Sequence, residues 1–199
     1  MMFSGIVETI GKITRFEKKQ DCIYLSVLPE IPFLDLKIGD SVSVNGVCLT
    51  VVNIHDNIFD MSIVNETMRV TNLGYLNTTS IINLERSMKC NDRISGHYVQ
   101  GHVDCVGNIV QINNPSEGNI IITIQFPNQF KKYIVNKGYI ALDGMSITVI
   151  KVIEDTFTIT LIPHTKKITI AKDYQINSKI NLEFDILSKY VENIMRASQ

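Results

Sequence analysis

The sequence lacks an excess of basic side chains, because 19 lysines and arginines face 20 aspartates and glutamates and the formal net charge is −1. Proteins that bind nucleic acid by releasing counterions normally carry such an excess, so this class is disfavoured. The chain also lacks an uninterrupted apolar run of the ~18 residues that a membrane span needs. Apolar residues are not scarce, since they make up 45% of the 199 residues, and this excludes global disorder.

The first residues, 1–12, lack the basic segment and following apolar stretch of a secretory signal. We therefore expect a cytoplasmic protein whose thiols stay reduced. The four cysteines show no Cys-x-x-Cys spacing, and the four histidines do not cluster with them in the sequence. The sequence thus predicts neither a disulfide framework nor a bound metal.

An internal repeat is the most informative pattern in the chain. Residues 5–11 resemble 101–107 at an offset of 96, and residues 45–51 resemble 143–149 at an offset of 98. Two shorter matches have the offset of 98 as well: Glu66-Thr67 with His164-Thr165, and Ile82-Asn83-Leu84-Glu85 with Ile180-Asn181-Leu182-Glu183. Blocks in one order at nearly one offset indicate a duplicated domain.

Each half has the pattern of short β-strands. Residues 41–44 and 47–51 alternate around Asn45-Gly46, a strong hairpin signal, and Asp143-Gly144 supplies the same turn chemistry in the second half. The pattern predicts a small antiparallel barrel or sandwich in each half. Further β-rich runs lie at 22–27, 59–64, 119–126 and 156–162, and short helical turns are expected at 33–36 and 129–133.

The C-terminal residues 185–196 predict an amphipathic helix, with Asp185 as its N-cap. Two interpretations of its apolar stripe remain open, packing on its own barrel or contact with another subunit. The stripe consists of Ile186, Leu187, Tyr190, Val191, Ile194 and Met195.

The strand around Cys48 suggests a site between the halves. Side chains alternate along a strand, so Cys48 and Thr50 share one face, and Ser146 and Thr148 share the equivalent face of the second half. If the aliphatic residues of 47–51 point into the barrel, these polar groups face outward. The alternative is that they are ordinary polar residues of solvent-facing strands.

The two halves differ at positions that matter for chemistry. The first half has Ile6, Cys48 and Ser87 where the second has His102, Ser146 and Asp185. Such divergence indicates different roles for the two halves. The alternatives are a structural histidine at 102, a small packing residue at 48 and a simple helix cap at 185.

Four segments carry a resemblance to a known family. They are Phe3-Ser4-Gly5-Ile6-Val7-Glu8, the run from Ser41 to Val51, Asn83-Leu84-Glu85-Arg86, and Gly96-His97-Tyr98-Val99-Gln100-Gly101-His102-Val103-Asp104. Together they closely resemble riboflavin synthases, over nearly the whole chain. Asn-Gly-Val-Cys-Leu-Thr-Val followed by Gly-His-x-x-Gln-Gly-His is a specific combination.

The resemblance implies an all-β fold of two tandem, homologous, six-stranded antiparallel Greek-key barrels, at 1–96 and 97–184, and a C-terminal helix at 185–199 that forms a homotrimer. It implies that two molecules of 6,7-dimethyl-8-ribityllumazine give riboflavin and 5-amino-6-ribitylaminouracil, without cofactor or metal. Each barrel would bind one molecule, and the active site would lie between neighbouring subunits. The sequence leaves open whether the protein associates with lumazine synthase.

The resemblance also assigns residues. His102 with Thr148 would be the base or proton relay, and Cys48, Ser41, Ser146 and Asp185 would deliver or orient a nucleophile. The first barrel would hold its ligand with Gly5, Ile6, Val7, Cys48, Leu49, Thr50, Ser62, Ile63, Val64, Asn65, Glu66 and Thr67. The second would use Gly101, His102, Val103, Lys137, Ser146, Ile147, Thr148, Leu161, Ile162, Pro163, His164, Thr165 and Lys166. His164 and Cys105 depart from the residues common in the family, glutamate and glycine.

Two other functions could use a similar barrel. A lumazine protein would bind the same ligand as a chromophore without turnover, but it tends to lose the divergent polar groups that stand here at Cys48, His102, Ser146 and Thr148. A flavin-binding domain of the ferredoxin reductase type would need an Arg-x-Tyr-Ser type motif and an adjoining nucleotide domain, and the sequence shows neither.

Overall fold

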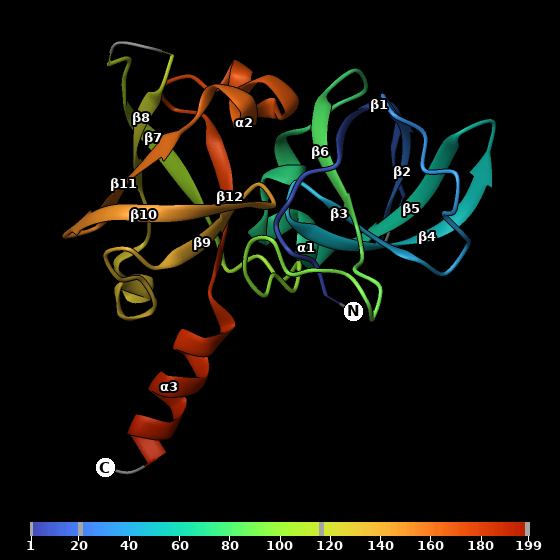
Figure 1. Ribbon diagram of the computed structural model, residues 1–199. Coiled ribbons are helices and arrows are strands. Elements are labelled where there is room, and N and C mark those ends of the chain that lie inside the picture. The colour runs from blue at the N-terminus through green and yellow to red at the C-terminus, as the bar shows by residue number, and fades with distance from the viewer. Residues whose placement is uncertain (1, 20–21, 116–117, 198–199) are drawn as a thin grey trace.

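The computed structural model describes residues 2–19, 22–115 and 118–197. Two closed six-stranded barrels lie side by side, and one helix extends from the second barrel (Figure 1). All strand pairs within the barrels are antiparallel. The predicted all-β duplication is therefore confirmed, and each half is a barrel and not a sandwich.

The first barrel has the strand order β1-β2-β5-β4-β3-β6. A short helix, α1 (Asn65–Val70), and a 3-10 turn, η1 (Asn72–Tyr75), connect β5 to β6. The strands are β1 (Thr9–Lys18), β2 (Cys22–Pro29), β3 (Ser41–Val44), β4 (Val47–His55), β5 (Ile58–Val64) and β6 (Ile81–Arg86).

The second barrel repeats this order as β10-β11-β8-β7-β12-β9. Its extra elements are η2 (Asn128–Tyr133), α2 (Pro163–Ile168) and η3 (Ile170–Asp173). The strands are β7 (Cys105–Asn113), β8 (Ile120–Gln125), β9 (Tyr139–Leu142), β10 (Met145–Ile153), β11 (Thr156–Leu161) and β12 (Lys179–Phe184). Register shifts in β4 between Val51 and Asn53 recur in β10 between Val149 and Lys151, so the halves share their irregularities as well.

The two predicted hairpin turns are confirmed. Asn45 and Gly46 have φ values of 46° and 79°, and Asp143 and Gly144 have 44° and 82°. Positive φ at both central residues is what a two-residue type I′ turn requires. The two turn tips meet, because a Cβ added to Gly46 would lie 2.7 Å from the backbone nitrogen of Gly144.

Buried amides and one buried carboxylate join the barrels at these turns. Asn83 in β6 donates to the carbonyl oxygen of Asp143 at 2.9 Å, and Asn181 in β12 donates to that of Asn45 at 2.8 Å. The Asp143 carboxylate also accepts hydrogen bonds from Asn72 Nδ2 at 2.8 Å, Asn181 N at 2.8 Å and Tyr174 Oη at 2.7 Å. Burial raises the pKa of Asp143 to about 7.

The predicted C-terminal helix is present as α3 (Ile186–Ala197), and Asp185 caps it by accepting a hydrogen bond from the Leu187 backbone N–H at 3.0 Å. The helix points away from both barrels (Figure 1). Apart from Ile186, which is half-buried, the residues of the predicted stripe are exposed, with Leu187 at 58%. The polar side of α3 holds it to the second barrel, through ion pairs of Lys132 with Glu192 at 2.6 Å and of Lys189 with Asp104 at 2.7 Å. Packing of the stripe on its own barrel is therefore wrong.

Of the two short helical turns expected, η2 contains residues 129–133 and confirms one. Residues 33–36 form only a single hydrogen-bonded turn, with Leu36 N donating to the Phe33 carbonyl at 3.2 Å. The aromatic ring of Phe33 packs instead on Phe59, at a centroid distance of 6.2 Å.

Candidate active site

The strand faces around Cys48 and Ser146 lie as the alternation predicts. The side chains of Val47, Leu49 and Val51 are buried in the first barrel, while Thr50 is exposed and Cys48 half-buried. In β10, Ser146 is half-buried and Thr148 exposed, but Ile147 is only partly buried at the edge of the second core. Both polar pairs therefore face away from the barrel interiors.

Each of these two strands receives a chain segment that leads into the opposite barrel. Ser146 N donates to the carbonyl oxygen of Gly5 at 2.7 Å, and Cys48 N donates to that of Gly101 at 2.9 Å. Both glycines have positive φ, 76° and 77°, and a Cβ on either would lie 2.6 Å from the Cβ of its partner. Only glycine fits at these two crossing points.

The crossing corrects the predicted grouping of residues. Gly5, Ile6 and Val7 were expected beside Cys48, and 101–103 beside Ser146, but the structure exchanges the two segments. Val7 packs in the core of the second barrel, and Val103 packs against the core of the first. The physical reason is that each segment runs along the seam between the barrels before its strand begins at residue 9 or 105.

Two buried glutamates that the prediction missed hold the crossing segments in place. Glu85 at the end of β6 accepts from Ser4 N at 2.8 Å and Gly5 N at 3.1 Å, and Glu183 accepts from Gln100 N at 2.6 Å and His102 N at 2.9 Å. Burial raises the pKa of both carboxyls, that of Glu85 to about 7, against the lowering effect of these hydrogen bonds. The sequence feature that could have revealed them is the repeated Ile-Asn-Leu-Glu block, which supported the duplication and, at residues 83–86, the family resemblance, but no role for either glutamate.

A third residue that the prediction missed is His97. Its Nδ1 lies 2.6 Å from Ser146 Oγ, and its ring stacks on Tyr139 at a centroid distance of 5.4 Å. Burial lowers the pKa of His97, while the nearby Asp185 carboxylate acts in the opposite direction. His97 is the first histidine of the Gly-His-x-x-Gln-Gly-His motif, and the sequence could have drawn attention to it there. The prediction gave a role only to the second histidine of the motif. That second histidine, His102, has an exposed side chain, as has Thr148.

The segments at 62–67 and 161–166 lie where β5 and β11 end and α1 and α2 begin. Ile63 and Leu161 point into the cores, so only their backbones can meet a ligand, whereas Val64 and Ile162 are exposed. The hydroxyl-bearing and basic residues Thr67, Thr165 and Lys166 are half-buried, and the other exposed members of the predicted set are Ser62, Asn65, Glu66, Pro163 and His164. Glu66 is held by Arg69 at 2.6 Å.

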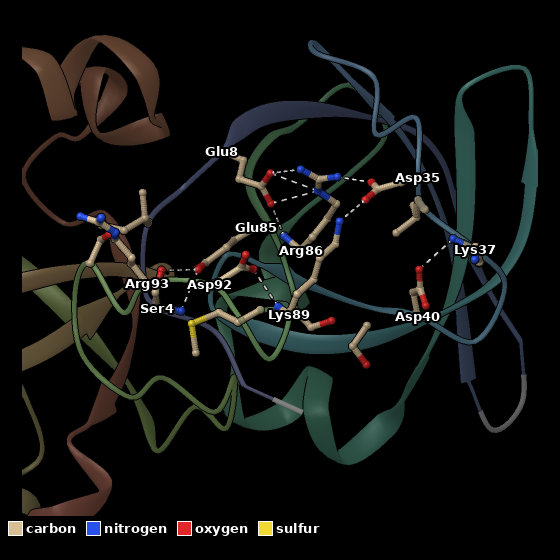
Figure 2. Close-up of a pocket in the computed structure, with 16 residues that line it drawn as sticks. Ser4, Glu8, Asp35, Lys37, Asp40, Glu85, Arg86, Lys89, Asp92 and Arg93 are labelled. Atoms are coloured by element: carbon tan, nitrogen blue, oxygen red, sulfur yellow. Dashed lines mark hydrogen bonds and ion pairs between the residues drawn. The ribbon is translucent and has the colours of Figure 1, made fainter.

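Ser41 and Ile6 line a cavity of about 760 Å³ on the first barrel (Figure 2). Its walls carry opposite charges, and Figure 2 shows Arg86 directed at Glu8 and Asp35. Cys48 and Thr50 do not line this cavity, although Ser41 is the register partner of Thr50 in the β3–β4 pair. By the duplication, Ser87 in this cavity corresponds to Asp185, at the start of α3.

Lys137, Cys105 and Cys48 lie in three different surroundings. Lys137 is exposed at a turn with φ 63°, and its backbone N–H donates to the Val149 carbonyl at 2.7 Å. Cys105 is buried, which raises the pKa of its thiol to about 12 and makes it an unreactive core residue. Cys48 packs against a small apolar cluster of Phe3, Val99 and Ala141 between the barrels.

Within residues 2–19, 22–115 and 118–197, no three histidine, cysteine, aspartate or glutamate side chains are placed to hold a metal ion. In the same part of the chain, no helix is both long and apolar enough to cross a membrane. The four cysteines, Cys22, Cys48, Cys90 and Cys105, are free thiols.

Comparison with known proteins identifies the family to which the chain belongs. The model of the lumazine binding domain matches the chain twice, at residues 4–87 and 100–185. Riboflavin synthase of Mycobacterium tuberculosis (strain ATCC 25618 / H37Rv) is 40% identical over 201 residues, which cover 99% of this chain and all of that protein. The chain belongs to the riboflavin synthase family. Riboflavin synthase of Bacillus subtilis (strain 168) is 39% identical and covers 96% of the chain and 88% of that protein. Riboflavin synthases are transferases, and this is the enzyme class of the chain.

Solved structures support the fold independently. LumP complexed with riboflavin superimposes with a TM-score of 0.84 at 22% identity, over 92% of this chain and 99% of that one. LumP complexed with 6,7-dimethyl-8-(1'-D-ribityl) lumazine superimposes with a TM-score of 0.82 at the same identity and coverage. This chain is far more similar in sequence to the riboflavin synthases, at 40% identity, than to LumP, at 22%. Its function is therefore that of the enzyme and not that of a non-catalytic lumazine protein.

Proposed function

We propose that the protein converts two molecules of 6,7-dimethyl-8-ribityllumazine into one riboflavin and one 5-amino-6-ribitylaminouracil. The observation that carries the proposal is the pair of equivalent outward-facing strand sites whose reactive side chains differ, a thiol at Cys48 and a hydroxyl at Ser146. Two like sites suit two molecules of one substrate, and different side chains suit the different fates of donor and acceptor.

Each barrel binds one lumazine on its outer face in this proposal. In the first barrel, the exposed Thr50 and the segment 62–67 border the site, and in the second Thr148 and 161–166 do so. Val64 and Ile162 offer apolar surface to a flat ring, and neighbouring hydroxyls and backbone groups bind its polar edge. Because the glycine segments are exchanged, Gly101–Val103 complete the site at Cys48, and Gly5–Val7 complete the site at Ser146.

The reaction needs orientation, a base and a nucleophile. Holding two heterocycles face to face turns a bimolecular step into an effectively unimolecular one. His102 beside the first site, with Thr148 of the second site of the neighbouring subunit, is the base or proton relay that removes a proton from the acidic methyl group at C7 of one ring. Cys48, Ser146, Ser41 and Asp185 deliver or orient the nucleophile at C7 of the other.

The protein works as a homotrimer in this proposal, assembled through α3. Five apolar side chains of its stripe are exposed, which is an apolar surface typical of a subunit contact. The first barrel of one subunit then faces the second barrel of its neighbour, and the active site lies between them. The division into units at 1–96, 97–184 and 185–199 belongs to the same proposal, as does a cytoplasmic location, which the four free thiols support.

Incubation of metal-free protein with the lumazine alone tests the proposed reaction. Flavin absorbance and chromatography should show riboflavin and the pyrimidine in equal amounts, with two lumazines consumed for each riboflavin. An obligatory nicotinamide, flavin or metal would refute it, as would tight binding of the lumazine without turnover.

A further inference from the structure

His97 is a buried residue beside β10, and it contacts the proposed substrate site of the second barrel at Ser146. Only 6% of the residue is exposed. Three elements hold it: its backbone N–H donates to the Ser4 carbonyl at 3.1 Å, Tyr139 of β9 stacks on its ring with an interplanar angle of 10°, and Ser146 of β10 lies against Nδ1.

The residue before it makes this approach possible. A Cβ at Gly96 would lie 2.1 Å from the Ser4 carbonyl oxygen, 2.6 Å from Ser146 Cβ and 2.8 Å from Ser146 Oγ. Gly5 approaches the same serine as closely, because a Cβ added to it would also lie 2.6 Å from Ser146 Cβ. Ser146 is thus enclosed by two glycines and one imidazole, a surrounding that fixes the position of its hydroxyl group.

We propose that His97 is a positioning residue for Ser146: its Nδ1 accepts a hydrogen bond from the Ser146 hydroxyl, so that the lone pairs of that oxygen point to the substrate. The proposal rests on the proposed function, because it assumes that Ser146 faces a lumazine in the second barrel. At 2.6 Å the contact is a short hydrogen bond between a hydroxyl and a ring nitrogen. A neutral imidazole with its proton on Nε2 has an acceptor at Nδ1, whereas a protonated one has only donors.

The charge state of the imidazole therefore sets the direction of the serine hydroxyl. The titratable groups that face His97 are Asp185, at the junction of β12 and α3, and Tyr139 in β9. Burial lowers the pKa of His97 more than the Asp185 carboxylate raises it, which favours the neutral ring. Protonation at lower pH places a proton on Nδ1, which then donates to Ser146 Oγ and turns the hydroxyl proton toward the substrate.

Nuclear magnetic resonance of the full-length protein with ¹⁵N-labelled histidine tests the hydrogen bond without any turnover. The result expected near pH 7 is an unprotonated Nδ1 and a protonated Nε2 for His97, with a changed Nδ1 shift in Ser146→Ala. A protonated Nδ1 near neutral pH, or a His97 resonance that is identical in Ser146→Ala, would overturn the proposal. This experiment stands even if the protein makes no riboflavin, so it separates this inference from the proposed reaction.

Kinetics of two variants test the functional part. His97→Leu removes the acceptor, and we expect kcat to fall roughly tenfold or more, as for a lost hydrogen bond in the transition state, with KM little changed. His97→Asn keeps an acceptor oxygen near the position of Nδ1 but does not titrate. Its kcat should exceed that of His97→Leu, and the ratio of wild-type to His97→Asn kcat should decline as the pH falls through the His97 pKa measured by resonance.

The matched control is His55→Asn, the same change at an exposed histidine at the end of β4. It should leave both kcat and its pH dependence unchanged. A wild-type kcat in His97→Leu, or a pH-independent ratio in His97→Asn, would show that His97 only packs the seam between the barrels.

Discussion

The side-chain amide of Asn181 in the second barrel donates a hydrogen bond of 2.8 Å to the backbone carbonyl of Asn45 in the first. The same amide donates to Asn72 Oδ1 at 2.8 Å, and its oxygen accepts from Asn72 N at 2.6 Å. Asn83, its counterpart in the duplication, makes two side-chain bonds, to the Asp143 carbonyl and from Ile170 N at 2.9 Å. Buried hydrogen bonds thus join the two barrels, and Asn181 makes more of them with its side chain than Asn83 does.

Asn181→Ala should destabilise the protein by about 3 kcal/mol, because it leaves buried groups of Asn45 and Asn72 without their partners. Asn83→Ala should cost about 2 kcal/mol, since fewer groups lose a bond. Urea unfolding followed by circular dichroism measures both. Asn193→Ala, on the exposed part of α3, serves as the control and should change little. An Asn181→Ala protein as stable as the control would show that the amide bonds do not hold the barrels together.

Asp143 should make the free energy of unfolding depend on pH. Its pKa in the folded state, about 7, lies above the ordinary value of 3.8. The folded protein therefore binds a proton more tightly than the unfolded chain, and stability from this group is present below pH 3.8 and lost as the pH rises through about 7.

Asp143→Asn removes this dependence, and it copies Asn45, which occupies the equivalent turn position. The variant should be more stable than the wild type at pH 8 and similar to it near pH 4. Comparing the two proteins cancels the contributions of Glu85 and Glu183, whose raised pKa values act in the same direction. Parallel stability curves would contradict a titrating Asp143.

Gly101→Ala should impair turnover beyond its effect on stability. The new methyl group meets the Cys48 side chain at 2.6 Å and adds the strain of an alanine at φ 77°. Gly39→Ala is the matched control, because its φ is 93° but no atom lies within 4 Å of the added Cβ. Both changes should cost about 1–2 kcal/mol for the backbone, and only Gly101→Ala should displace Cys48 and lower kcat. Steady-state riboflavin formation and thermal unfolding are measured for both. Equal kcat values in the two variants would show that the close approach has no part in catalysis.

Cys48→Ala should lower kcat by about 100-fold or more while the protein still binds the lumazine, since a group that acts in the transition state is lost. Cys48→Ser should also lose most turnover, and Ser146→Cys should not give a doubly active enzyme, because the two sites have different roles. Cys90→Ala removes an exposed thiol and should have no effect. Near wild-type turnover in Cys48→Ala would return that residue to the packing role that its contact with Phe3, Val99 and Ala141 already shows.

Leu187→Glu combined with Val191→Glu should abolish both assembly and turnover, because it places charges within the exposed stripe of α3. Asn193→Glu adds a charge to the same helix outside the stripe and should leave both intact. Sedimentation gives the mass of each variant, and riboflavin formation gives its activity. A monomer with full activity would show that one chain contains the complete active site.

Local patterns in the sequence predicted much of this architecture. The alternation at 47–51 assigned Cys48 and Thr50 to the outer face correctly, and the two Asn-Gly-type turns were placed correctly, because both depend on a few neighbouring residues. The end-to-end repeat gave the two barrels for a similar reason, since a duplicated sequence folds into a duplicated structure.

Contacts between the halves could not be predicted in this way. The local sequence of residues 5–7 does not indicate which barrel the segment packs against, because the duplication makes the two barrels similar. Val7 joins the second core only because the barrels pack seam to seam. His97 was missed for a related reason, because its partner Ser146 lies 49 residues away and the motif gives no distance between them.

The exchanged glycine segments also bear on how such a chain arose. Each half places its N-terminal arm on the other half, which is the geometry of a domain-swapped dimer. Two separate copies of one half could complete each other by exchanging arms in the same way. Joining them in a single chain replaces a concentration-dependent association with an intramolecular one, so the swap persists at any dilution. It also frees the two copies to diverge, as the thiol at 48 and the hydroxyl at 146 have done.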